Sequence, residues 1–577
     1  MSRLLIRSFP ASRRYRLEQA GVPPLLARLY AARGVADISE VDYRLQCLAP
    51  PEALLHAEEA ARLIADALAA NARLLIVADY DCDGATACAV GIRGLEGLIR
   101  ARPGCGASVC YLVPDRFTLG YGLSPAIVDL AAREKPDLII TVDNGIASLE
   151  GVARARALGI ATLITDHHLP GDSLPDADCI VNPNQPGCAF PSKHLAGVGV
   201  MFYVLIALRA ELRRRGWFCA RAEPSLASLL DLVALGTVAD VVPLDYNNRI
   251  LISAGLARMR SGRSSPGISA LLAAAGRRPE TASVFDFGFL LGPRLNAAGR
   301  LENMSIGIEC LLTDDPDRAL MLARQLDRLN RERRDIEAGM REQAETLLDK
   351  IDMADTPPGV ALFAENWHPG VVGILASRVK EKLHRPVFAF ARGENGEIKG
   401  SGRSIPGLNL RDALDSLSKR VPGLLLRFGG HAAAAGVTMR EADFPRFSAL
   451  FSEIAAELIA PEDLTRRLNT DGSLDLSSCN LAAAKVLGAQ IWGQGFPPPL
   501  FYDAFEVRGE RLLKEKHLRL TLAREGRPFN AVWFNRAVSP PPRASFAYAL
   551  EVNAFRGVES AELRIEECAD AEGGALP

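Results

Sequence analysis

Three aspartates at alternate positions are the first residues in this sequence whose types and spacing could do chemistry. Residues 79–84 read DYDCDG and directly follow the apolar run LLIVA. Carboxylates this close raise one another's pKa unless a cation lies among them. The spacing therefore predicts that Asp79, Asp81 and Asp83 bind a metal ion.

Calcium in an EF-hand loop is the first alternative to test, because such a loop also begins DxDxDG. An EF-hand requires a bidentate Glu at the twelfth loop position, where this chain has Val90, and it requires a helix before the loop. Here LLIVA is typical of a buried strand, and ATACAVGIRGLEGLIR after the motif has helical spacing. The sequence therefore predicts a strand-to-helix turn at the edge of an α/β sheet, where ligands bind.

Two further apolar runs end in residues of the same kind. DLIITVDNG (137–145) brings Asp143, and IATLITDHH (160–168) brings Asp166, His167 and His168. The intervening SLEGVARARALG has the length and pattern of a crossover helix. In a βαβ unit the two strands run parallel, so we expect both groups of side chains at the same edge of the sheet.

A fourth motif adds Asp240, at the end of the apolar and predicted helical stretch LASLLDLVALGTVADVVPL. Each motif alone is more often a turn or a helix cap. Together they predict a cluster of carboxylates and imidazoles, which suits Mn²⁺ or Mg²⁺ better than zinc. A bridging carboxylate can hold two such ions about 3.5 to 4 Å apart, the arrangement used in phosphoester hydrolysis.

Length and composition constrain the elements that must position these residues. A chain of 577 residues is expected to form about three or four domains of roughly 100 to 200 residues each. The formal net charge of −2 excludes a globally basic nucleic-acid binder, so phosphate must be bound by local patches. Eleven cysteines without a CxxC pair predict a reducing cytoplasm, and no apolar run predicts a signal peptide or a membrane span.

The four motifs DYDCDG, DNG, DHH and GTVADVVPL, in this order, resemble those of the DHH phosphoesterase superfamily. The resemblance continues through PRLNAAGR (293–300), GSGRS (400–404) and GGHAAAAG (429–436), and it covers the chain from about residue 45 to about residue 560. Within the superfamily the sequence is most similar to the bacterial single-strand-specific 5′ to 3′ exonucleases.

This resemblance implies roles for the residues of the cluster. Asp143 would bridge two divalent ions, Mn²⁺ or Mg²⁺, and His168 would face the substrate phosphate. Asp166 would orient a histidine from behind, since metal-binding imidazoles usually donate their other N–H to such a group. The implied metal ligands are Asp79, Asp81, Asp83, Asp143, His167 and Asp240.

The resemblance also implies an α/β multidomain fold. A parallel-sheet DHH catalytic domain is expected over 46–314, with an N-terminal segment, 1–45, packed on it. A charged amphipathic helix over 315–355 is predicted to bridge two lobes. An α/β DHH-associated domain (356–465) and a C-terminal β-barrel of the OB-fold type (466–577) follow.

Several residues outside the metal cluster are expected to contact the substrate. Within PRLNAAGR, Arg294 is a predicted catalytic residue, and Asn296 and Arg300 are predicted to reach the phosphate. In the DHH-associated domain, FGGHAAAAG places His431 between a Gly pair and a predicted helix start, where free backbone N–H groups favour an anion. We assign Ser401, Arg403 and His431 to phosphate binding. Arg116 is a further candidate, with an ordinary surface arginine as the alternative.

The C-terminal module is predicted to bind single strands along a basic track. Seven Lys or Arg residues against three Glu lie between Arg508 and Arg527. Cations beside aromatic faces suit sequence-neutral single-strand binding, although the neighbouring aromatics could instead form the barrel core. The track residues that we expect are Arg508, Arg511, Lys514, Lys516 and Arg519.

The combined interpretation is a single-stranded-DNA-specific 5′ to 3′ exonuclease that releases 5′-mononucleotides in DNA recombination and repair. One alternative is a DHH phosphodiesterase for short oligonucleotides or cyclic dinucleotides, which would need no basic track. The other is a non-catalytic single-strand-binding scaffold, which would have lost metal ligands. The expected partners are single-stranded DNA, a single-strand-binding protein and a helicase, and we expect a monomer that does not bind membranes.

Overall fold

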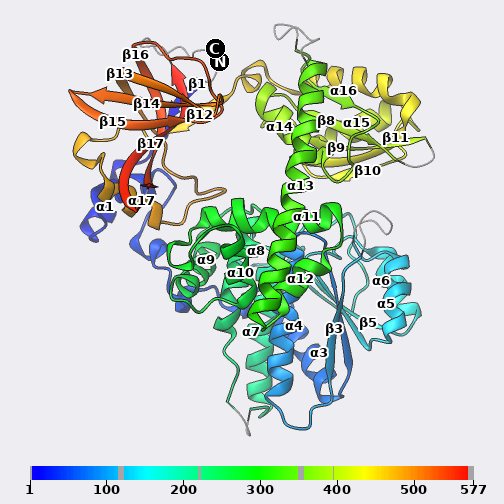
Figure 1. Cartoon of the computed structure of the whole chain (residues 1–577). Coiled ribbons are helices and arrows are strands. Elements are labelled where there is room, and N and C mark those ends of the chain that lie inside the picture. Colours follow the sequence, from blue (N-terminus) through cyan, green and yellow to red (C-terminus); the bar gives the residue numbers. More distant parts are fainter. Residues whose placement is uncertain are drawn as a thin grey trace.

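The computed structural model arranges the chain as a lower first domain, a long helix, an upper second domain and a barrel at one side (Figure 1). It describes residues 3–114, 122–218, 222–348, 356–393, 396–555 and 557–569. Arg116, one of the expected substrate contacts, lies outside the described residues. The predicted fold class is confirmed, with a parallel-sheet domain, a long helix, a mixed α/β domain and a closed barrel.

The first domain is built on a five-stranded parallel sheet in the order β3-β2-β4-β5-β6. The sheet contains β2 (Arg73–Ala78), β3 (Ser108–Leu112), β4 (Leu138–Val142), β5 (Ala161–Thr165) and β6 (Cys179–Val181). Parallel strands are joined by crossover helices, so helices cover both faces. Every strand therefore ends at the same edge of the sheet.

Alternate residues of β2 face opposite layers of the first domain. Leu74 and Ile76 pack into a core with α3, α4 and α7, whereas Leu75 and Val77 pack into a core with α5 and α6. This is the period of two that a strand imposes on its side chains. The helices that cover the two faces of the sheet are α3 (Ala57–Ala69), α4 (Cys82–Arg100), α5 (Pro125–Ala131), α6 (Leu149–Ala157) and α7 (Gly197–Arg214).

A group of helices completes the first domain, and three of them, α10, α11 and α12, pack against the long helix α13. The group includes a π-helix, η7, directly before α11. Its members are α8 (Leu230–Ala239), α9 (Tyr246–Arg260), α10 (Pro266–Ala274), η7 (Asp286–Leu291), α11 (Gly292–Leu301) and α12 (Ser305–Leu312).

The helix α13 (Pro316–Leu348) connects the two lobes, as the charged amphipathic pattern predicts. Its 33 residues span about 50 Å at 1.5 Å per residue. Near its start Leu322 and Leu326 belong to the core of the first domain, and near its end Met340 and Leu348 belong to a core of the second. The helix therefore packs against both domains and fixes their separation.

The second domain has a mixed sheet in the order β10-β11-β9-β8-β7. Only β7 and β8 pair in parallel, and α14 (Val372–Leu383) joins them. The two helices α15 (Leu410–Arg420) and α16 (Phe444–Leu458) pack together with a phenylalanine-rich core. The strands are β7 (Val360–Phe363), β8 (Val387–Arg392), β9 (Glu397–Arg403), β10 (Arg427–Gly430) and β11 (Ala434–Arg440).

The C-terminal module is a closed barrel in the order β13-β14-β15-β17-β16. A short helix, α17 (Leu481–Ala489), precedes it and packs against β16. Closure leaves the barrel without free strand edges. Its strands are β13 (Phe501–Leu513), β14 (His517–Arg524), β15 (Arg527–Trp533), β16 (Arg543–Phe555) and β17 (Val558–Ala569).

The N-terminal segment lies mainly against the C-terminal module, and not only on the first domain as expected. Strand β1 (Arg3–Ile6) pairs in parallel with β12 (Arg467–Thr470), and after α1 (Ala11–Gln19) and α2 (Pro24–Ala31) the buried Arg33 forms an ion pair with Asp471. The following residues contact the first domain, where Arg249 donates to the carbonyl of Glu40. Strand pairing between distant segments has no local sequence signal, which explains the difference.

No helix in the described part of the chain is long and apolar enough to cross a membrane.

Candidate metal and phosphate site

The carboxyl ends of three neighbouring strands bring the predicted cluster together. Asp79 follows β2, Asp143 follows β4 and Asp166 follows β5, and these strands are adjacent in the sheet. The backbone N–H of Asp143 donates to the carbonyl of Thr165, which extends the ladder by one residue. The common end of parallel strands thus places the side chains at one edge, as the sequence predicts.

The DYDCDG loop is held by the starts of two helices. Asp81 is the N-cap of α4 and accepts a hydrogen bond of 3.0 Å from the N–H of Gly84. Asp83 is fully buried and accepts from the N–H groups of Gly197 and Val198, at 2.6 and 2.9 Å, at the start of α7. Free N–H groups at a helix start stabilise a carboxylate, so both side chains are fixed before any ion binds.

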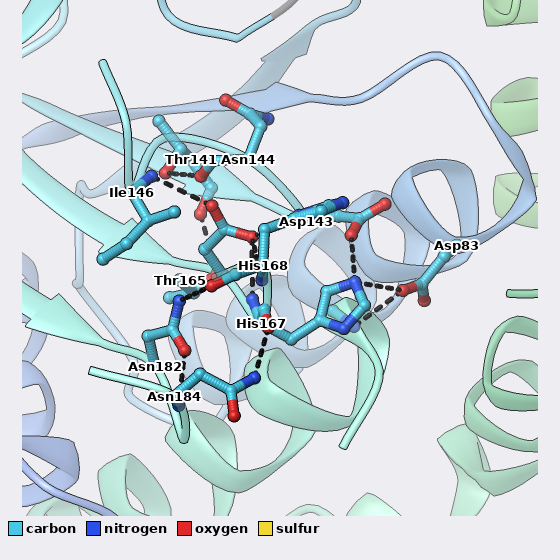
Figure 2. A network of polar contacts seen from close by, with 12 residues as sticks. Asp83, Thr141, Asp143, Asn144, Ile146, Thr165, His167, His168, Asn182 and Asn184 are labelled. Carbon is cyan, nitrogen blue, oxygen red and sulfur yellow. Dashed lines mark hydrogen bonds and ion pairs between the residues drawn. The ribbon is translucent and has the colours of Figure 1, made fainter. Parts of the chain in front are cut away.

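His167 lies at the centre of the acidic cluster (Figure 2). Its Nε2 is 3.1 Å from Asp143 Oδ1, 3.5 Å from Asp240 Oδ2 and 3.8 Å from Asp83 Oδ2. Neither His167 Nε2 nor Asp143 Oδ1 has a hydrogen-bond partner among the described residues, although both atoms are buried. Buried polar atoms without partners are rare in proteins and require an explanation.

A divalent metal ion fits these donors. Three sets of side chains each offer ligand atoms within 4.8 Å of one another, and Asp143 and His167 each belong to two sets. Carboxylate oxygens with one imidazole nitrogen suit Mn²⁺ or Mg²⁺. The sets are Asp79, Asp81 and Asp143; Asp83, His167 and Asp240; and Asp143, His167 and His168. The sharing of Asp143 supports its proposed bridging role.

Charge crowding and burial perturb the pKa values of this cluster. Burial, with the charge of Asp81, raises the pKa of Asp83 to about 7. Burial and the neighbouring aspartates raise the pKa values of Asp143 and Asp240 well above the ordinary value. Burial and the charge of His168 lower the pKa of His167 to about 4, so its imidazole is neutral and can act as a ligand.

His168 and Asp166 form a separate pair beside the cluster. Burial alone would lower the pKa of His168, but its hydrogen bond of 2.8 Å to Asp166 and the charge of that carboxylate raise it to about 9. Asp166 also accepts from the backbone N–H groups of Ile146, His167 and His168. The predicted orienting role of Asp166 is thus directed at His168, which carries a proton at neutral pH.

The turns that present two of the acids have left-handed backbone. Asp143 has φ +62°, and Val241, directly after Asp240, also has φ +62° and is 63% exposed. A β-branched residue in this region is strained, and such strain concentrates at functional sites. The surrounding structure must hold both turns in place.

The C-terminal module helps to hold the turn after Asp240. The N–H of Leu244 donates to the carbonyl of Gln494 at 2.7 Å, and Gly493 and Gly495 pack closely on Leu244 and Pro243. Arg249 donates to the carbonyl of Leu244 and lies over the ring of Phe496, 4.2 Å from its centroid. A metal-site turn is therefore anchored to the segment that leads into the barrel.

The predicted residues of α11 have three different environments. The guanidinium of Arg294 pairs with Asp327 at 2.9 Å and donates to the carbonyl of Leu290, and its catalytic role stays a prediction. Asn296 accepts from the backbone N–H of Cys82 at 2.7 Å, inside the DYDCDG loop. Arg300 donates to the carbonyl of Gly370 and so links the first domain to the second. Arg294 therefore anchors α11 to α13.

The second domain contains a partly buried cation, Arg403, among the residues predicted to bind phosphate. Arg403 is at the end of β9, beside Ser401 on the same strand, and burial lowers its pKa. Among the described residues no carboxylate forms an ion pair with Arg403. Burial and the charges of Arg403 and His168 lower the pKa of His431, which places these three groups close enough to interact electrostatically. The phosphate-binding role of Ser401, Arg403 and His431 stays a prediction, and the helix start that was expected after His431 is instead the strand β11.

Comparisons with known proteins match both the domains and the whole chain. Family models for the DHH family N-terminal domain, the DHHA1 domain and the RecJ OB domain match residues 73–237, 357–457 and 470–567. The single-stranded-DNA-specific exonuclease RecJ of Salmonella typhimurium is 47% identical over 563 residues, which are 95% of this chain and 96% of the relative. The chain belongs to the RecJ family.

Solved structures of RecJ from Thermus thermophilus agree with the fold. The complex with Mn²⁺ has a TM-score of 0.80 at 32% identity and covers 99% of this chain and 80% of that one. The complex with Mg²⁺ has a TM-score of 0.76 at 30% identity, with 98% and 78% covered.

The RecJ OB domain presents the predicted basic track on its surface. Arg508, Arg511, Lys514, Lys516 and Arg519 are all exposed. Arg511 and Arg519 are directly opposite each other on β13 and β14, where like charges repel unless an anion lies between them. Of the neighbouring aromatics, Phe505 and Trp533 are buried in the barrel, whereas Phe534 is 50% exposed.

Some residues that build the site carry no sequence signal of their own. The side-chain amide of Asn182 donates to the carbonyl of His168 at 2.9 Å, and that of Asn184 donates to the carbonyl of His167 at 2.6 Å (Figure 2). A Cβ at position 197 would lie 2.6 Å from the Cβ of Asp143, so only glycine fits there. The NPN segment (182–184) directly after β6 could have been noticed as a polar strand end.

Proposed function

We propose that this chain is a single-stranded-DNA-specific exonuclease that hydrolyses phosphodiester bonds from the 5′ end and releases 5′-mononucleotides. The observation that carries the proposal is the buried cluster of carboxylates and imidazoles at the ends of three parallel strands, which offers three sets of metal-binding groups. The charge of His168 in this cluster also acts on His431 of the second domain. The whole-length similarity to proteins named as RecJ exonucleases supports it.

Two divalent ions, Mn²⁺ or Mg²⁺, would be held by Asp79, Asp81, Asp83, Asp143, His167 and Asp240. When bound, such ions activate water and stabilise the charge that develops on phosphate. Asp143 is the proposed bridge. The neutral His167 supplies a nitrogen lone pair, and the N–H groups of α7 keep Asp83 oriented toward the cluster.

His168 acts on the substrate phosphate in this proposal. Asp166 keeps its imidazole protonated, so a fixed positive charge and an N–H donor stand beside the cluster. Preorganised charges of this kind stabilise a transition state that gains negative charge. Asp166 itself is buried and bonded on both oxygens, which suits positioning and not proton transfer.

The polarity of degradation arises in the second domain. Arg403, Ser401 and His431 bind the terminal 5′-phosphate at a fixed distance from the metal ligands. Arginine is well suited to this role because its planar fork pairs with phosphate through two hydrogen bonds. The basic track of the RecJ OB domain binds the strand further from its end. A role in recombination and repair, a cytoplasmic location, a monomeric state and the protein partners named above remain predictions.

Product analysis on strands labelled at one end tests the proposed function. With Mn²⁺ or Mg²⁺, a 5′ label should appear at once as a mononucleotide, while a 3′ label should remain on strands that shorten gradually. A duplex with blunt ends should not be degraded. Early release of the 3′ label would contradict the proposed polarity, and cleavage restricted to dinucleotides or cyclic dinucleotides would favour the small-substrate phosphodiesterase.

A further inference from the structure

A cavity of about 440 Å³ lies in the first domain, along the second half of α4. Asp83 is in the first turn of that helix, whereas the cavity is lined by its residues from Ile92 to Arg100. At 1.5 Å per residue these positions lie about 14 to 26 Å further along the helix axis. The cavity is therefore separate from the candidate metal site.

The walls of the cavity come from α4, from η5 (Leu226–Leu229) with the first turn of α8, and from the junction of α9 and α10. Gly97 leaves space beside α4, because a Cβ at this position would meet only Pro224, at 3.8 Å. The helices α4, η5 and α8 supply an apolar wall, which consists of Ile92, Leu226, Leu229 and Leu232.

The two acids that line the cavity are already paired. Glu96 pairs with Arg100 at 2.9 Å, and Asp314 pairs with Arg93 at 2.8 Å. The guanidinium of Arg93 also donates to the carbonyl of Leu311 and so holds the end of α12. These four charges balance one another and leave the remaining cations of the cavity without a carboxylate.

The remaining cations are Arg258, in the last turn of α9, and Arg263, shortly after that helix. Arg258 donates to the carbonyl of Arg263 at 2.6 Å, and neither guanidinium forms an ion pair with a carboxylate of the described residues. The Nε of Arg258 is buried and has no hydrogen-bond partner there. A buried donor without a partner is rare in proteins, so these two arginines predict an anionic ligand.

The start of α10 adds further hydrogen-bonding groups to the same wall. Ser265 is the N-cap of this nine-residue helix, but its side chain does not bond to the helix N–H groups. Its Oγ is buried and has no hydrogen-bond partner within the described part of the chain. The first N–H groups of a helix and its dipole also favour an anion. Together with the two arginines, this wall suits a phosphate group.

We propose that this cavity binds a nucleoside monophosphate. The phosphate accepts hydrogen bonds from Arg258, Arg263 and the start of α10, and the base lies against the apolar wall beside Gly97. A free phosphate would leave the apolar wall without a partner, and an uncharged ligand would leave both arginines without a counter-ion. The cavity has a volume within the range of about 300–1,000 Å³ that is usual for small-molecule sites. This binding site is additional to the proposed exonuclease site.

Calorimetric titration of the full-length chain with deoxyadenosine 5′-monophosphate, in the presence of a chelator, tests the proposal. The nucleotide should bind more tightly than deoxyadenosine or inorganic phosphate, since it alone contacts both walls. Ser225→Glu should weaken nucleotide binding about tenfold relative to Ser225→Gln, because it places a like charge beside the phosphate at nearly equal side-chain size. Ser225 is exposed and its side chain forms no cap hydrogen bond, so both variants should fold.

The second variant is Arg263→Ala, which removes an exposed donor and should weaken binding about tenfold through the loss of a charge-assisted hydrogen bond. Its matched control is Arg278→Ala, an exposed arginine beyond the other end of α10 and outside the cavity, which should not change affinity.

Photolabelling with the 8-azido derivative of the nucleotide, followed by peptide mapping, locates the bound ligand. The label should appear on segments that line the cavity, and Ser225→Glu should lose it. Equal affinity in the two Ser225 variants, binding of phosphate as tight as that of the nucleotide, or labelling confined to the second domain would overturn the proposal. Binding is measured without metal, so failure of the exonuclease test would leave these results unchanged.

Discussion

The first and second domains contribute groups of opposite charge to the candidate site, and the pKa values of these groups are shifted in opposite directions. The first domain gathers buried carboxylates whose pKa values are raised, whereas the second presents Arg403 and His431, whose pKa values are lowered. Each shift opposes the charge that the side would otherwise carry. The acidic side carries more carboxylates than the protonated His168 can balance, and Arg403 forms no ion pair among the described residues, so a phosphate with its metal ions would supply the missing counter-charges.

The largest expected effect comes from removing the proposed bridge on the acidic side. Asp143→Ala should lower the rate of hydrolysis about a thousandfold, because the loss of several kcal/mol of charge stabilisation has this consequence. DNA binding should persist, since the repulsion among carboxylates falls. Rates of mononucleotide release at saturating Mn²⁺ measure the effect, and Asp172→Ala, an exposed acid after the DHH motif, is the control. Retention of more than about a tenth of the rate would exclude the bridging role.

The next effect concerns stability in the absence of metal. Raised pKa values mean that the native state binds more protons than the unfolded state, so stability falls as pH rises through them. The pKa of Asp83, at about 7, and the pKa of His168, at about 9, set the pH range of this loss. The pKa values of Asp143 and Asp240 are raised as well. The pKa of His167 is lowered to about 4, so this group makes stability rise with pH, but only below its ordinary pKa of 6.5. Melting temperatures in chelator should therefore fall between pH 6.5 and 9.

The matched comparison for this pH effect is Asp143→Asn, which keeps the shape of the side chain without its charge. Its melting temperature in chelator should depend less on pH, and its advantage over the unmodified chain should grow with pH. Mn²⁺ should reverse the order, because only deprotonated ligands bind the ion. A metal-free melting temperature that rises across this window would contradict the charge-crowding account.

On the basic side, Arg403→Ala should reduce the preference for 5′-phosphorylated over 5′-hydroxyl strands about tenfold. A hydrogen bond to a charged group contributes about 1.5–3 kcal/mol, and the loss should appear mainly in KM. Degradation of both substrates by both proteins measures this, with Arg446→Ala on the exposed face of α16 as the control. If the variant keeps the full preference, another residue recognises the end.

The smallest expected effect is the loss of strand affinity when two arginines of the barrel are removed. Arg511→Ala/Arg519→Ala should weaken binding of long strands by a few-fold at moderate salt and lower the salt slope by about 1.4. The rate on bound strands should not change. Lys485→Ala/Arg543→Ala provides the comparison, since these cations already pair with Glu559 and Glu506. An equal slope in both variants would remove the evidence for an electrostatic track.

The acidic side was predictable because local pattern determines it. Apolar runs that end in Asp79, Asp143 and Asp166 predict parallel strands, and parallel strands end together. Asp240 was expected as a fourth acidic motif, whereas the residues of the second domain were predicted only through the family resemblance, because no periodicity relates a helix end at 240 to a strand end at 403.

Contacts between distant segments were not predictable. The ion pair of Arg294 with Asp327, the support of His167 and His168 by Asn184 and Asn182, and the anchoring of Leu244 by Gln494 all join residues whose types fit many other environments. Such side chains carry hydrogen-bonding capacity without a preferred partner. Only the assembled fold selects one.

The pairing of β1 with β12 has a consequence for biosynthesis. Translation produces Arg3 among the first residues, but its partner Arg467 is added only after most of the chain. At about 5–20 residues per second the nascent N-terminus waits roughly half a minute to a minute and a half for its strand partner. During that time the first two domains can fold, while the N-terminal strand remains an unpaired edge. A ribosome that stops before residue 467 therefore releases a chain whose first strand has nothing to pair with.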